Sequence, residues 1–246
     1  MERQIDRKSE QPTLPTKGES PRMFDRIAHR YDLINRVLTF RMDVGWRRAL
    51  GRQFPDRPDL AVLDVATGTG DVLLFALQRH RNIGLAVGID VAPRMMQIGV
   101  DKARRDDMAE RVQFVQGDAL ALPFADNSFD VVTISFGIRN VTDVPRALGE
   151  MRRVLKPDGR ALILEFSFPK NRLLRSSYLA YLRHVLPRVG GLLSGDAIPY
   201  QYLDKTVEGF PFGDRFCRIM TESGFAEVRQ KPLTFGIATV YSGAKK

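Results

Sequence analysis

The stretch Val62–Leu73, read V-L-D-V-A-T-G-T-G-D-V-L, constrains the fold more than any other part of the chain. An apolar run leads into Gly68 and Gly70, and a helical apolar pattern begins at Asp71. A buried strand, a glycine turn and a helix start in this order open a βαβ nucleotide-binding unit. Glycines there let the backbone turn tightly and approach a ligand without a Cβ in between. The stretch therefore predicts an α/β fold that binds a ligand at this turn.

The residues around the turn favour one class of nucleotide. A dinucleotide fingerprint needs a third glycine where Leu73 stands, and the carboxylate of Asp71 would repel a pyrophosphate at the helix start. A cationic ligand without phosphate, such as S-adenosylmethionine, would be helped by Asp64 and Asp71. Asp90 ends a second apolar run and suits a ribose diol with either ligand. The alternative is that the glycines only make a turn and Asp71 only caps a helix.

Composition excludes several classes of protein. The length of 246 residues suits one α/β domain, and the single cysteine, Cys217, excludes an internal disulfide and agrees with a reducing cytoplasm. No Cys/His cluster has the spacing of a metal site, no apolar run reaches the length of a membrane span, and the N-terminus lacks a signal-peptide core. The net charge of +9 suits an anionic partner, either a membrane surface or a nucleic acid, or simply keeps the protein soluble.

Two segments precede the first strand. Residues 1–21 are polar with three prolines and no periodicity, which predicts a disordered tail. We expect one ligand-binding domain to fill 22–246. Its first part, 22–58, has helical apolar spacing over Met23–Gln53, and we expect it to lie across the ligand cleft as a lid.

Strands and helices then alternate. The expected strands are Ala61–Ala66, Leu85–Asp90, Val112–Val115, Phe129–Ser135 and Arg160–Phe166, and the expected helices are Asp71–Gln78, about Pro93–Arg105 and about Val144–Leu155. Strands without polar alternation indicate a parallel sheet covered on both faces.

The pattern changes after Pro169. Residues 170–213 are expected to form a helical and loop insertion on the substrate side, with a helix over Leu173–Val189 whose remaining surface carries arginines. Gly190–Phe212 is predicted to be rich in loops. A helix over Phe216–Ser223 and an antiparallel hairpin of about Glu227–Leu233 and Ile237–Ser242 complete the chain.

At this point the residues resemble a known family, the ubiquinone/menaquinone biosynthesis C-methyltransferases. The likeness runs from about Arg22 to Lys245, and its most specific parts are F-G-I-R-N-V-T-D over 136–143 and P-Y-Q-Y-L over 199–203. The other matching stretches are 24–32, 63–71, 116–124, 153–159 and 233–238. The resemblance implies a class I S-adenosylmethionine-dependent methyltransferase with a Rossmann-like three-layer fold, whose seven-stranded, mostly parallel sheet has an antiparallel last strand.

The resemblance also implies the cofactor and its site. The positions that match the family's S-adenosylmethionine contacts are Thr69, Asp90, Asp118, Ala119 and Ser135, at the carboxyl ends of successive strands. With Asp64, Gly68 and Gly70 they make up the expected cofactor site, and no metal is expected. Each residue alone would more often be a turn or cap residue.

The chain departs from the family pattern in two places. Thr67 stands where the family usually has a glycine, and Asp43-Val-Gly-Trp46-Arg47 lacks the histidine of the family's His-Arg-x-x-Trp. The second departure leaves open what replaces that histidine.

The implied reaction moves a methyl group from sulfur to a ring carbon of a prenylated hydroquinol, with demethylmenaquinol favoured and a polyprenyl benzoquinol of ubiquinone synthesis as the alternative. The ring carbon becomes nucleophilic when a neighbouring phenol loses its proton. Arg139 and Asn140 follow the fourth strand and would face this acceptor. Arg139 stays protonated, so we expect it to stabilise the phenolate. Tyr31 is a further candidate, and His29 is more simply a solvent-facing residue.

The expected partners follow from this chemistry. A cytoplasmic enzyme is predicted, and the basic helix after Pro169 could hold it peripherally on an anionic membrane or merely expose a solvated face. A homodimer and a complex with other quinone-biosynthesis proteins both fit the sequence. A nicotinamide dehydrogenase is disfavoured by Leu73 and Asp71, and a nucleic-acid methyltransferase lacks the N-P-P-Y-type motif after the fourth strand. A subunit that only binds S-adenosylmethionine is the remaining alternative.

Overall fold

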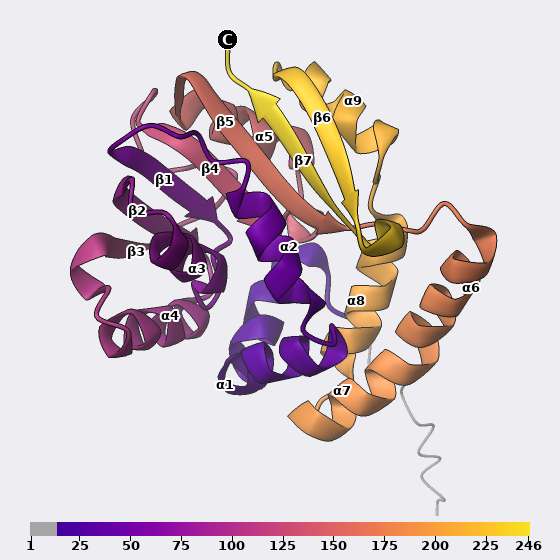
Figure 1. Cartoon of the computed structure of the whole chain (residues 1–246). Coiled ribbons are helices and arrows are strands. Elements are labelled where there is room, and N and C mark those ends of the chain that lie inside the picture. Colours follow the sequence, from indigo (N-terminus) through magenta and orange to yellow (C-terminus); the bar gives the residue numbers. More distant parts are fainter. Residues whose placement is uncertain (1–13) are drawn as a thin grey trace, which may run out of the picture.

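A computed structural model describes residues 14–246 and shows one seven-stranded sheet in the order β3-β2-β1-β4-β5-β7-β6 (Figure 1). The strands are β1 (Leu60–Val65), β2 (Ile83–Asp90), β3 (Val112–Gln116), β4 (Phe129–Ser135), β5 (Leu155–Phe166), β6 (Ala226–Leu233) and β7 (Ala238–Ala244). The first five run parallel, and β7 lies antiparallel between β5 and β6. The predicted α/β class, the seven strands and the antiparallel last strand are confirmed.

Helices cover both faces of the sheet because the strands are apolar on both sides. Alternate residues of β1, such as Leu63, pack with α5 (Val144–Val154) and α9 (Asp214–Glu222) on one face. The intervening residues, such as Val62, pack with α2 (Met42–Gly51), α3 (Asp71–Arg79) and α4 (Pro93–Arg105) on the other. The result is the predicted three-layer sandwich.

The segment before β1 contains two helices instead of one. α1 (Ser20–Leu38) ends at a tight turn in which Phe40 and Arg41 have positive φ, and α2 starts directly afterwards. The predicted tail is partly wrong, because Lys17–Glu19 forms a 3₁₀ turn and Ser20 begins α1 with Pro21 in its first turn, a position that proline favours. The rest of that prediction, residues 1–13, lies outside the described residues.

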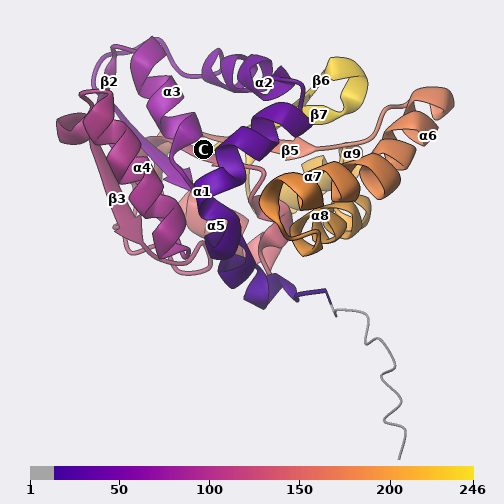
Figure 2. The same cartoon turned by 90° about the horizontal axis from the view of Figure 1, so that it is seen from below.

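The loop-rich segment predicted over 190–212 is wrong. α6 (Arg172–Ala180) continues through a π-helical turn (Tyr181–Val185) into α7 (Leu186–Ser194), and α8 (Ile198–Gly209) follows. A Cβ on Gly190 would lie 2.6 Å from the ring of Tyr200, so the glycine allows α7 and α8 to pack closely. The glycines that suggested a loop therefore serve helix packing. Together with α1, these helices form a separate layer beyond the carboxyl edge of the sheet, called the helical layer below (Figures 1 and 2).

Over residues 14–246, no helix is long and apolar enough to span a bilayer, and no cluster of three or more His, Cys, Asp or Glu side chains could hold a metal ion.

Candidate functional site

The glycine turn after β1 has the geometry that the sequence predicted. Gly68 and Gly70 have φ of +56° and +73°, a region that side chains rarely adopt. A Cβ on Gly70 would also lie 2.9 Å from the ring of Phe114, so this position excludes any side chain without a shift of that ring. Gly68 lines a cavity of about 340 Å³ at the carboxyl edge of the sheet, called the polar cavity below.

Asp90, at the end of β2, lines the polar cavity. Its two oxygens accept hydrogen bonds from the backbone N–H groups of Gly68 and Ala92, both at 2.8 Å. Each oxygen keeps a further lone pair that a diol could use. Burial raises the pKa of Asp90, against the N–H groups that lower it. The residue predicted to bind the ribose therefore lies in the cavity and also fixes the glycine turn.

Asp118 and Ala119 line the same cavity from the loop after β3. Asp118 Oδ1 accepts a hydrogen bond from the backbone N–H of Leu120 at 2.9 Å, which orders this loop. Val91 and Met95, which follow β2, also line it. Apolar side chains together with a carboxylate suit a flat heterocycle such as adenine.

Four of the predicted cofactor residues, Asp64, Thr69, Gly70 and Ser135, do not line the polar cavity. Asp64 lies behind the turn and accepts hydrogen bonds from the hydroxyls of Thr67 at 2.7 Å and Thr133 at 2.5 Å. Thr67 thus uses its hydroxyl where the family usually has a glycine. Thr69 donates its hydroxyl to Asp32 of α1 at 2.6 Å. Ser135 Oγ is buried without a hydrogen-bond partner in the described chain.

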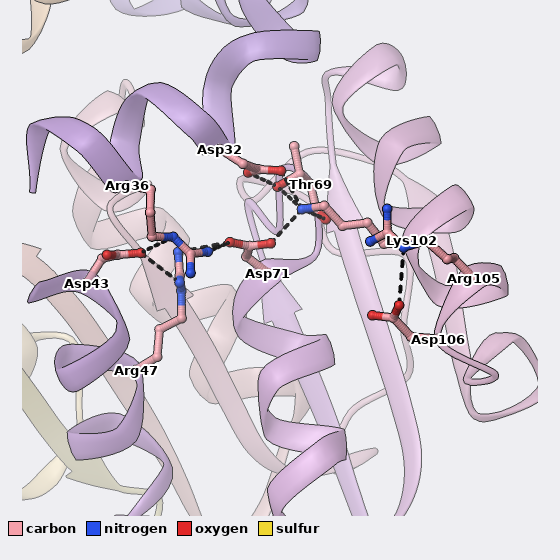
Figure 3. Close-up of polar contacts among 9 residues, drawn as sticks. All are labelled: Asp32, Arg36, Asp43, Arg47, Thr69, Asp71, Lys102, Arg105 and Asp106. Atoms are coloured by element: carbon pink, nitrogen blue, oxygen red, sulfur yellow. Dashed lines mark hydrogen bonds and ion pairs between the residues drawn. The ribbon is translucent and has the colours of Figure 1, made fainter. Parts of the chain in front are cut away.

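Asp71 does not act as the free carboxylate that the sequence suggested. It forms ion pairs with Arg47 at 3.0 Å, Lys102 at 2.5 Å and Arg36 at 3.4 Å, and these three cations hold its pKa below the usual range although burial opposes them (Figure 3). Lys102 also contacts Asp32 at 2.5 Å. The predicted help of Asp71 to a cationic ligand is wrong, because its charge is already neutralised.

A second cavity of about 350 Å³, called the apolar cavity below, lies between the sheet edge and the helical layer. Its walls come from α1, α2, α6, α7 and α8, and the side chains are mostly aromatic or aliphatic. Among them are Ile34, Trp46, Phe136, Phe166, Tyr178 and Leu182. Trp46 donates its indole N–H to Thr234 Oγ1 at 2.7 Å, so the tryptophan of the altered family motif supports this wall.

Arg139 is the principal charged group that reaches the apolar cavity from the sheet edge. It follows β4, is 4% exposed, and donates from Nη1 to Glu165 Oε1 at 2.9 Å and to the Phe136 carbonyl at 2.5 Å. Its guanidinium lies 5.4 Å from the centre of the Phe166 ring, and its Nε has no hydrogen-bond partner among residues 14–246. A fixed cation with a spare donor in an apolar site can stabilise an oxyanion.

The two cavities share a wall made by Phe24 and Tyr31 of α1. Burial raises the pKa of Tyr31, so its hydroxyl is protonated near neutral pH. Asn140, next to Arg139, lines the polar cavity, and its Oδ1 is buried without a partner in the described part of the chain. Of the three predicted catalytic residues, Tyr31 thus lines both cavities, Arg139 lines the apolar cavity and Asn140 lines the polar cavity. His29 is exposed on α1 and lines neither cavity.

Sequence reasoning missed Glu165 and Lys102. Glu165 is fully buried near the end of β5, and burial raises its pKa although Arg139 opposes this. A single carboxylate in the otherwise apolar run A-L-I-L-E-F was the available signal. Lys102 belongs to a helix with many charges, so nothing in the sequence separated it from solvent-exposed neighbours.

Comparisons with known proteins agree with this geometry. The ubiE/COQ5 methyltransferase family matches residues 16–245. The ubiquinone/menaquinone biosynthesis C-methyltransferase UbiE of Geotalea uraniireducens is 46% identical over 94% of this chain and 99% of its own length. The demethylmenaquinone methyltransferase of Deinococcus radiodurans is 43% identical over 94% of both chains. A solved S-adenosylmethionine-dependent methyltransferase of Thermotoga maritima, a possible histamine N-methyltransferase, shares the fold with a TM-score of 0.66 at 20% identity, over 92% of this chain and 99% of that one.

Proposed function

This chain belongs to the ubiE/COQ5 methyltransferase family, and we propose that its methyl acceptor is the ring of a demethylmenaquinol. It is an S-adenosylmethionine-dependent C-methyltransferase of quinone biosynthesis. Relatives named demethylmenaquinone methyltransferase include those of Deinococcus radiodurans and Thermus thermophilus, which favours the naphthoquinol over the benzoquinol of ubiquinone synthesis.

One observation carries the proposal: the polar and the apolar cavity meet at Phe24 and Tyr31. A methyl transfer needs two ligands whose reacting atoms lie in line at short distance, and holding them so supplies a large part of the acceleration. A polar cavity for a nucleoside and an apolar cavity for a prenylated ring provide this arrangement.

The residues of the polar cavity fit S-adenosylmethionine. Bound there, it would supply the methyl group to be transferred. We propose that Asp90 binds the ribose hydroxyls and that Asp118 and Ala119 bind the adenine. The backbone of Gly68 then approaches the cofactor most closely, and Gly70 makes the turn possible. Asp64 and Thr69 then act through the turn, by holding Thr67 and by joining the turn to α1. Ser135 keeps a hydroxyl free at the end of β4.

Arg139 activates the acceptor in this proposal. A quinol hydroxyl beside its guanidinium would ionise more easily, and the negative charge would spread onto the ring carbon that is methylated. The guanidinium cannot itself take the proton, so water accepts it. Water also accepts the proton that the ring carbon releases when its C–H bond breaks after methylation. Tyr31 and Asn140 orient the ring and a proton-accepting water in this proposal, because Tyr31 lines both cavities and Asn140 follows Arg139 in the chain.

The helical layer has a second role in the proposal. α1 contacts both cavities and is joined to the glycine turn through Asp32 and Thr69, so we assign it as the lid over the cofactor. The prenylated substrate is a membrane lipid, so we place the enzyme peripherally at the inner, cytoplasmic surface of the membrane. Because one chain builds both cavities, the chemistry needs neither a homodimer nor a complex of biosynthetic enzymes. Either assembly is compatible with the two cavities.

The direct test offers the purified protein S-adenosylmethionine and two reduced acceptors, a demethylmenaquinol and a demethylated polyprenyl benzoquinol with the same tail. Mass spectrometry should show one added methyl group on the naphthoquinol ring carbon. Preference for the benzoquinol would keep the chemistry and replace the acceptor. Cofactor binding without turnover of either quinol would contradict the proposal. It would favour the alternative of a subunit that only binds S-adenosylmethionine.

A further inference from the structure

Two exposed phenylalanines stand at the mouth of the apolar cavity. Phe40, in the turn between α1 and α2, is 73% exposed, and Phe235, in the turn between β6 and β7, is 82% exposed. Both line the cavity together with Leu174 of α6, which is itself exposed. The three segments come from distant parts of the sequence and lie on one side of the molecule (Figures 1 and 2).

The backbone at these two phenylalanines is strained. Phe40 has φ of 49° and Phe235 has φ of 56°, where a bulky side chain costs free energy that glycine or asparagine would avoid. Neither ring gains much burial within the chain in return. A strained, exposed aromatic side chain at a turn does little for folding, so its use lies in contact with something outside the molecule.

The charge next to this rim indicates what that contact is. Between Glu165 and Asp196 the chain contains no acidic residue and five basic ones, Lys170, Arg172, Arg175, Arg183 and Arg188, all exposed. Lys170 and Arg172 form no ion pair within the described chain and adjoin Leu173, which is 76% exposed. Apolar side chains beside uncompensated basic ones suit the surface of an anionic bilayer.

The size of the apolar cavity points the same way. A cavity of about 350 Å³ is at the small end of those that hold one drug-sized ligand. A prenyl tail of many units must therefore continue out through the mouth, past Phe40 and Phe235. An aqueous mouth would expose the tail to water, whereas a mouth against lipid would not.

We infer that Phe40, Leu173, Leu174 and Phe235, with Lys170 and Arg172, form an edge that inserts into an anionic membrane surface and opens the apolar cavity to the lipid. The inference rests on the proposed function for the identity of the tail. The occupant of this edge is the bilayer itself.

Vesicle flotation of the full chain without substrate tests the edge. We expect the protein to float with vesicles that contain phosphatidylglycerol and to stay in solution with pure phosphatidylcholine. Phe40→Asn combined with Phe235→Asn should lower the partition coefficient about tenfold or more. Asparagine tolerates positive φ, so the melting temperature of this variant should hold or rise. Leu85→Ser, at an exposed leucine of β2 outside both cavities, is the matched control and should float like the wild type.

A charge variant separates the edge from the chemistry. Lys170→Gln with Arg172→Gln should weaken binding to anionic vesicles about tenfold to thirtyfold and should leave turnover of a short-tailed quinol unchanged. Turnover of a long-tailed quinol embedded in vesicles should fall. If the wild type methylates the short-tailed quinol but binds no vesicles, the membrane-binding edge is contradicted and the proposed function stands. If it binds vesicles but methylates no quinol, the proposed function is contradicted and the edge stands. If the asparagine variant floats normally, or instead splits a wild-type dimer, the bilayer is not the occupant.

Discussion

Arg139 and Glu165 form a buried ion pair: Nη1 lies 2.9 Å from Oε1, and the two residues are 4% and 0% exposed. The pair joins the end of β4 to β5 and fixes the guanidinium against the Phe166 ring. Removing one partner of a buried pair leaves an uncompensated charge, whereas replacing both is often nearly neutral. The structure therefore allows the structural and the chemical role of Arg139 to be separated.

Arg139→Met should lower turnover about a hundredfold or more and also destabilise the fold by about 3–5 kcal/mol, because Glu165 loses its cation. Adding Glu165→Gln should restore most of the stability but none of the turnover. Calorimetric affinity for S-adenosylmethionine should be retained in the double variant. Chemical denaturation and initial rates measure the two effects, and recovery of turnover together with stability would show that Arg139 acts only in the fold.

Gly70→Ala should destabilise the protein by about 1–3 kcal/mol and reduce cofactor binding at least tenfold, because φ is +73° and the new Cβ would meet the Phe114 ring at 2.9 Å. Gly68→Ala is the matched comparison: its Cβ would meet only the flexible Met95 side chain, at 3.4 Å. We expect a smaller loss of thermal stability there. Equal losses would mean that backbone strain, and not the Phe114 contact, decides the effect.

Asp32→Ala should weaken S-adenosylmethionine binding about tenfold, because the Thr69 hydroxyl and Lys102 lose the carboxylate that joins α1 to the glycine turn (Figure 3). Asp101→Ala is the control, since Asp101 contacts only Gln97 and Arg104 of its own helix, on the exposed surface of α4. Titration calorimetry at low and high salt distinguishes the two. Unchanged affinity in the Asp32 variant would mean that the turn holds its shape without α1.

Asp64 should make stability depend on pH in a direction opposite to that of a salt-bridged carboxylate. Burial raises its pKa from 3.8 to about 6, so between these values the folded chain keeps a proton that the unfolded chain has released. Protonated Asp64 therefore stabilises the folded state, on the order of 3 kcal/mol, below about pH 4. This stabilisation is lost as the pH rises through 6.

Asp64→Asn removes this titration and keeps the Thr67 and Thr133 contacts within hydrogen-bonding reach. We expect the wild type to lose stability relative to the variant as the pH rises, when the unfolding free energies of both are measured in denaturant from pH 4 to pH 7. A flat difference would show that Asp64 ionises normally in the folded state.

The sequence by itself determined the order and type of the elements that form the sheet. The βα units were predicted with boundaries within two residues, except that β5 begins at Leu155 and not at Arg160. Buried parallel strands and amphipathic helices have periodicities that neighbouring residues alone specify. Gly68, Asp90, Asp118 and Ala119 do line one cavity, since the carboxyl ends of parallel strands meet at one edge.

Only the tertiary structure decided which side chains are free to meet a ligand. Asp71 and Thr69 follow the same turn as Gly68, but α1, α2 and α4 bring partners that engage both of them. The helices over 186–209 formed despite their glycines because Tyr200 packs against Gly190. Glu165 of β5 meets Arg139 of the turn after β4, 26 residues away in the sequence. Such contacts depend on packing between distant segments, which local patterns do not encode.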